Sequence, residues 1–105
     1  MEEIKELGIY LKDSLGWSKI QYSKKISESA GTIDVIAQSK GLKKKTLLIV
    51  IATDIYDAQI ALMLFNGLPK KYVQVIYLLE GDPFFIEGRP KEVIVVTKHE
   101  DLPSA

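Results

Sequence analysis

Carboxylates and lysines are the side chains in this sequence best suited to chemistry, since it contains no cysteine. Asp34 lies inside an apolar stretch at residues 32–38, and Glu6 lies near the N-terminus. Such carboxylates can hold Mg²⁺ through oxygen ligands or act as general acids and bases. The lack of cysteine excludes thiolate zinc sites and thiol nucleophiles. His99 has no second histidine at ligand spacing, so we predict surface exposure and no metal site.

A second group of candidate residues is basic. Residues 19–45 contain seven lysines and only two acidic residues. Lysines on turns can reach a phosphate backbone, and the excess of lysine over arginine favours backbone contact over reading of base edges. The alternative is ordinary solubilising charge. The candidate nucleic-acid-binding residues are Lys24, Lys25, Lys43, Lys44 and Lys45.

The length and composition describe one small domain. The chain has 105 residues, 14 basic against 14 acidic side chains, and 47% hydrophobic residues. Its longest apolar runs, at residues 47–52 and 60–65, are far shorter than the roughly 20 residues that span a bilayer. The acidic N-terminus is unlike a signal peptide, so we expect a cytoplasmic protein. We expect one domain over residues 1–98 and a disordered polar tail over residues 99–105.

Periodic patterns predict the elements that position the candidate residues in the first half of the chain. Apolar residues three or four apart predict an amphipathic helix over residues 4–15, which ends at Gly16. Alternation then predicts a half-buried strand over residues 20–26, and a second strand follows at residues 32–38. Residues 46–53 are continuously apolar and β-branched, which is typical of a central strand covered on both faces.

The second half of the chain adds a helix and further strands. Asp54 can cap a helix over residues 55–66. Strands are predicted at residues 72–79 and 93–96, with a hairpin or short extra strand at residues 81–88 between them. The fold class is therefore α/β, with a mixed central sheet flanked by helices. Its first three strands form an antiparallel meander, and a parallel crossover follows.

The predicted helix over residues 55–66 is apolar around its whole circumference. One face can pack on the sheet, but the other must meet the first helix or a second subunit, since monomers rarely expose a large apolar patch. We expect a homodimer or a subunit of a larger complex. The candidate interface residues are Ile60, Met63 and Leu64.

The stretch from Gly31 to Thr53 resembles the core of the PD-(D/E)xK nuclease superfamily. It reads G-x-I-D-V-I-A, then a hairpin, then the apolar strand T-L-L-I-V-I-A-T. The resemblance covers residues 3–97 and is closest to the small archaeal Holliday-junction resolvases. It implies a restriction-endonuclease-like core of the order α-β-β-β-α-β with additional terminal strands. A composition rich in Lys, Glu and Ile with no Cys agrees with a heat-adapted source.

The sequence departs from this superfamily at the catalytic positions. Ile51 and Thr53 stand where the family strand carries Glu and Lys, so only Asp34 remains, with Glu6 as a second vestigial acid. A nuclease of this type needs two carboxylates for Mg²⁺ and a lysine for the attacking water. We therefore predict no catalytic residues and no cofactor. Asp34 can instead pair with a lysine, and Glu6 can serve as solvated helix surface.

These observations predict a catalytically inactive nuclease-like protein. It would bind DNA, or serve as an accessory subunit of a replication, recombination or repair complex. One alternative is a protein-interaction module that does not contact nucleic acid. Another is a weak Mg²⁺-dependent nuclease in which Asp54, Asp57 or Gln59 has replaced the lost groups, although Asp54 and Asp57 also fit a helix-capping role.

Overall fold

The computed structural model describes residues 2–25, 31–41 and 44–105. The predicted order of helices and strands is confirmed, and two short 3₁₀ turns are added near the C-terminus. The elements are α1 (Glu2–Asp13), β1 (Ser18–Lys24), β2 (Ile33–Gln38), β3 (Thr46–Ala52), α2 (Ile55–Asn66), β4 (Val73–Leu78), η1 (Pro83–Phe85), β5 (Val93–Val96) and η2 (His99–Asp101).

The five strands form one mixed sheet in the order β1-β2-β3-β4-β5. The pairs β1–β2 and β2–β3 are antiparallel, whereas β3–β4 and β4–β5 are parallel. The predicted meander, the crossover and the central position of β3 are thus confirmed. Leu47, Leu48 and Ile49 of β3 are fully buried because helices cover the sheet on both sides.

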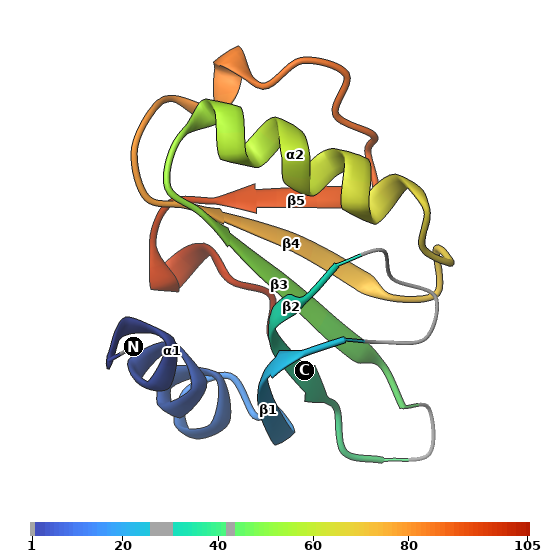
Figure 1. Ribbon diagram of the computed structural model, residues 1–105. Helices are drawn as coiled ribbons and strands as arrows, with labels where there is room; N and C mark the ends of the chain where they lie inside the picture. Colours follow the sequence, from blue (N-terminus) through green and yellow to red (C-terminus); the bar gives the residue numbers. More distant parts are fainter. Residues whose placement is uncertain (1, 26–30, 42–43) are drawn as a thin grey trace.

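The two faces of the sheet have separate cores. On one face α2 packs Ala61 and Phe65 against Leu48 of β3, and Figure 1 shows α2 and α1 on opposite sides of the sheet. On the opposite face α1 packs Leu7 and Leu11. Since α1 lies across the sheet from α2, it cannot cover the outer side of that helix. No helix among the described residues is long and apolar enough to cross a membrane.

The predicted cap at the end of α1 is confirmed. Gly16 has a φ of 80°, and the N–H of Trp17 donates to the carbonyl oxygen of Leu11 at 3.0 Å. This hydrogen bond joins residues six positions apart across a left-handed glycine, and it satisfies a carbonyl left open at the helix end. It turns the chain sharply from α1 into β1.

The C-terminal segment, predicted to be disordered, is packed against the end of α1. Trp17 is only 1% exposed, and its Nε1–H donates to the carbonyl oxygen of Pro103 at 2.8 Å. The N–H of Ala105 donates to the carbonyl oxygen of Leu15, and Leu102 is buried. A buried indole N–H needs an acceptor, and the segment supplies it. Local polarity gave no sign of this contact.

The hairpin or short extra strand predicted at residues 81–88 is wrong, because the segment contains the 3₁₀ turn η1 and no strand. Because β4 and β5 are parallel, their connection must cross from one end of the sheet to the other, which a tight hairpin cannot do. The connection contains η1 and is held to α2 by two hydrogen bonds. Gln59 Nε2 donates to the carbonyl oxygen of Glu87 at 3.1 Å, and the N–H of Glu87 donates to Gln59 Oε1 at 2.6 Å.

Candidate nucleic-acid interface

Asp34 lies near the start of β2, where the regular pairing with β3 ends at Val35 and Ile49. The side chain is half-buried. Its Oδ2 accepts a hydrogen bond from the N–H of Ile51 at 2.7 Å. The carboxylate thus satisfies a backbone donor of β3 beyond the last regular pair, which is a structural task different from the predicted pairing with a lysine.

The electrostatic setting of Asp34 agrees with this role. Burial raises the pKa of the Asp34 carboxyl, and the hydrogen bond from the Ile51 N–H lowers it in part. In the described part of the chain, no three His, Asp or Glu residues group together as a metal site would require. The described surroundings of Asp34 therefore favour its role as a hydrogen-bond acceptor for the backbone of β3.

Ile51, where the sequence resemblance leads one to expect a glutamate, has apolar surroundings. The side chain of Ile51 lines a small cavity of about 80 Å³, together with Leu7, Tyr77, Leu79 and His99. Glu6 is exposed on α1, whereas its neighbour Leu7 points into the core. The first helix thus contributes Leu7 to this cavity and leaves Glu6 in solvent.

The acids after β3 form the cap of α2. The N–H of Asp57 donates to Asp54 Oδ1 at 2.9 Å, and Asp57 Oδ2 accepts hydrogen bonds from both the N–H and the hydroxyl of Thr53. These bonds satisfy donors at a helix start. They also engage Thr53, where the sequence resemblance leads one to expect a lysine, in the helix cap.

His99 is not the isolated surface residue that was predicted. Its Nδ1 lies 2.6 Å from the hydroxyl of Tyr77, and its ring packs edge-on against Tyr77 and at 5.1 Å from Tyr10. Burial raises the pKa of the Tyr77 hydroxyl, and the nearby Glu100 and Asp101 raise it further. The neutral hydroxyl is thereby favoured, and this aromatic group joins η2 to the α1 side of the sheet.

The structure separates the predicted lysine group into two sets. Lys24 pairs with Ile33 at one end of β2, and Lys25 follows it. Lys44 and Lys45 precede β3 at the other end of β2. There Lys45 is fixed by hydrogen bonds with Ser39: the N–H of Ser39 donates to the Lys45 carbonyl at 2.9 Å, and the Lys45 N–H donates to Ser39 Oγ at 2.7 Å. Lys43 lies outside the described residues.

A groove between α1 and β1 brings together lysines that sequence reasoning did not group. Its volume is about 500 Å³, and Lys12, Lys19 and Lys40 line it. These lysines come from a helix end, a strand and a turn, so no local period links them. Considered by itself, Lys12 is simply a cation in the last turn of α1, where it interacts favourably with the helix dipole. The remaining lining residues are Gly8, Ile9, Trp17, Ser18, Ile20 and Tyr22.

The predicted interface residues on α2 lie on or beside its open side. Ile60 is 48% exposed and Met63 is 75% exposed, while Leu64 is half-buried. Tyr56, one turn before Ile60, is 73% exposed. All three predicted residues border an open groove of about 640 Å³ that reaches the ends of β2 and β3. The outer side of α2 is therefore apolar, and none of the other described residues covers Tyr56, Ile60 or Met63 fully.

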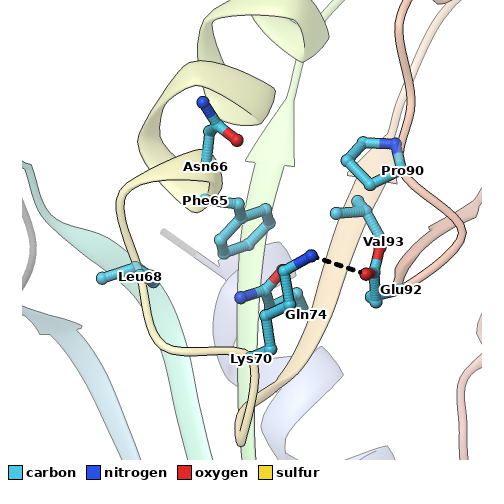
Figure 2. Close-up of a pocket in the computed structure, with 8 residues that line it drawn as sticks. All are labelled: Phe65, Asn66, Leu68, Lys70, Gln74, Pro90, Glu92 and Val93. Atoms are coloured by element: carbon cyan, nitrogen blue, oxygen red, sulfur yellow. Dashed lines mark hydrogen bonds and ion pairs between the residues drawn. The ribbon is translucent and has the colours of Figure 1, made fainter.

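A further cavity at the C-terminal end of α2 is small. Its volume is about 40 Å³, and the ion pair between Lys70 and Glu92, at 2.8 Å, lies at its mouth (Figure 2). Gln74 inside it is buried and donates weakly to the carbonyl oxygen of Pro69. This space suits a few water molecules and not an organic ligand.

Comparisons of this chain with protein-family models, with curated proteins and with solved structures found no match.

Proposed function

We propose that this chain is a catalytically inactive relative of the PD-(D/E)xK nucleases, similar to the archaeal Holliday-junction resolvases, that binds DNA without cutting it. The observation that carries the proposal is the 2.7 Å hydrogen bond between Asp34 and the backbone of Ile51. The one acid retained from the family pattern is engaged by the backbone, beside an isoleucine in place of a ligand. In this role the chain acts alone or as an accessory subunit of a DNA-processing complex.

The arrangement of elements is compatible with a restriction-endonuclease-like core. A helix precedes an antiparallel meander, and a second helix leads into a strand parallel to the centre of the sheet. The family's catalytic strand corresponds to β3, at the middle of the sheet. Loss of both the second carboxylate and the lysine removes metal binding and water activation together.

The exposed lysines support binding. Lys19, Lys40, Lys44 and Lys45 are exposed around one end of the sheet, near the C-terminal turn of α1. Lysine presents a mobile point charge without the fixed fork of arginine, which suits phosphate contact and not base recognition. We therefore expect binding that depends on DNA shape and salt more than on sequence.

The test is fluorescence anisotropy with labelled four-way-junction, duplex and single-stranded DNA. Titrations are run at two salt concentrations in the presence of Mg²⁺, and the products are examined on denaturing gels. We expect salt-sensitive binding and intact DNA. Cleavage that disappears in Asp34→Ala would establish the weak nuclease instead. Lack of binding at low salt would favour a protein-interaction module.

One observation favours a second function, self-association through α2. Tyr56, Ile60 and Met63 are spaced four and three residues apart, so they form a continuous apolar row on the open side of the helix. Monomeric proteins seldom leave such a row in water. A homodimer joined through α2 is compatible with DNA binding, since α1 lies on the other face of the sheet.

A further inference from the structure

We propose that the groove between α1 and β1 is the place where the phosphate backbone of duplex DNA binds. This inference rests on the proposed function and assigns it to a definite surface. It also differs from the prediction made from sequence, which placed Lys24 and Lys25 in the binding site. The proposal depends on the charge of the groove, on its shape and on the surroundings of its aromatic side chains.

The groove concentrates positive charge. Lys12, Lys19 and Lys40 all line it and are exposed. None of the residues lining the groove is acidic, and none of these lysines forms an ion pair with another described residue. Like charges gathered from three separate segments repel one another, so a polyanion that neutralises them is favoured.

The backbone of β1 is distorted where it supplies the middle lysine. Lys19 has a φ of 51°, in the left-handed region that residues other than glycine rarely adopt. The pairing register between β1 and β2 shifts between Ser18 and Gln21, around this residue. Such bulges redirect a side chain out of the regular alternation of a strand. Here the bulge accompanies a lysine that lines the groove with Lys12.

Close packing gives the groove a fixed wall. The hydroxyl oxygen of Tyr22 lies only 1.9 Å from where a Cβ at Gly8 would stand, so the two residues touch because Gly8 has no side chain. This contact brings β1 against the middle of α1. A groove whose walls are already packed loses little conformational entropy when a ligand binds.

The aromatic side chains of the groove are not free to stack on bases. Trp17 is buried with its Nε1–H bonded to Pro103, and Lys45 Nζ lies 5.7 Å from the centre of its ring. Tyr22 is half-buried against Gly8. Proteins that bind single strands depend on exposed aromatic platforms. The geometry therefore points to the backbone of a duplex, with Lys45 at the edge of the same surface.

The test compares two sets of charge removals in the full chain. The groove variant is Lys12→Gln, Lys19→Asn and Lys40→Gln, in which asparagine tolerates the left-handed backbone. The control variant is Lys24→Gln, Lys25→Gln and Lys91→Gln, which removes the same charge from exposed sites outside the groove. Circular dichroism checks the fold of each. Duplex affinity is measured across a salt series.

We expect the groove variant to bind duplex DNA at least about tenfold more weakly and to reduce the salt slope by about 2 to 3, as loss of three phosphate contacts requires. The control variant should bind duplex DNA with an affinity and a salt slope close to those of the unaltered chain. An equal loss of duplex affinity in both variants, or a larger loss in the control, would overturn the assignment of the groove as the binding site. The proposed function would still stand. Lack of DNA binding by the unaltered chain would overturn both.

A second measurement keeps the test decisive if the triple variant unfolds. Backbone amide resonances of the unaltered chain are followed as a short duplex is added. Shifts centred on Lys12, Lys19 and Lys40 support the proposal. Shifts centred on Lys24 and Lys25 contradict it. The single variant Lys40→Gln, in the turn after β2, should lower the salt slope by about 1.

Discussion

Asp34 is subject to two opposing effects at the scale of a single residue. Burial penalises its charge, whereas the N–H of Ile51 needs an acceptor. A neutral acceptor of the same shape would satisfy the backbone without the penalty. A nuclease would require the charge to be kept for a metal ion. The two roles therefore make different predictions for the same substitution.

We expect Asp34→Asn to leave the free energy of unfolding unchanged or to raise it near neutral pH, because the amide oxygen still accepts from Ile51. Asp34→Ala should lower it by about 1 to 3 kcal/mol, because the donor loses its partner. Denaturant titrations of the two variants measure the difference. An asparagine variant as unstable as the alanine variant would contradict this role.

The pH dependence of the stability difference between the unaltered chain and Asp34→Asn follows from the direction of the Asp34 pKa shift. The folded-state pKa of Asp34 is raised, so its protonated form is favoured by folding. The resulting stability is present below the unfolded pKa of about 3.9 and is lost as the pH rises through the higher folded value. The stability of Asp34→Asn relative to the unaltered chain should therefore be greater near neutral pH than at about pH 3.

At the scale of elements, Gly8 governs how closely α1 approaches β1. Alanine normally stabilises a helix by about 1 kcal/mol relative to glycine. Here the added Cβ would meet the Tyr22 hydroxyl, so Gly8→Ala should lower the free energy of unfolding by about 1 to 2 kcal/mol. In a Tyr22→Ala background the same change should be neutral or stabilising. A double-mutant cycle measures this coupling, and additive effects would show that the contact does not limit packing.

The second prediction at this scale concerns the exposed apolar side of α2. We expect the chain to sediment as a dimer at micromolar concentrations and Met63→Glu to sediment as a monomer, because a charge would be buried between subunits. Ile9→Glu is the matched control, since Ile9 is also an exposed apolar residue of a helix but lies on α1. A monomeric unaltered chain, or equal dissociation in both variants, would exclude α2 as the interface.

Local patterns predicted the elements well, and long-range contacts account for what they missed. The continuous apolar run of β3 and the Asp54 cap are set by neighbours in sequence, so they were predictable. The contact of Trp17 with Pro103 joins residues 86 positions apart. The grouping of Lys12, Lys19 and Lys40 likewise depends on how α1 docks on β1. Neither the Trp17–Pro103 hydrogen bond nor the lysine grouping produces a periodic pattern in the sequence.

At the scale of the whole molecule, the C-terminal segment closes one core. Ending the chain at Asp101 would remove buried Leu102 and the acceptor for the Trp17 indole. We expect the free energy of unfolding to fall by about 3 kcal/mol and the tryptophan emission to move to longer wavelength as water reaches the ring. Fluorescence during denaturation measures both effects. Unchanged emission and midpoint would show that this segment does not seal the core.

The distorted strand β1 has a consequence for how copies of the molecule can meet. It lies at one edge of the sheet, where unpaired backbone groups could otherwise recruit another chain. Lys19 and Ser23, both in the left-handed region, interrupt the row of hydrogen-bonding groups at two points, and the lysines on this strand add mutual repulsion. A flat ribbon of copies joined edge to edge is thereby disfavoured.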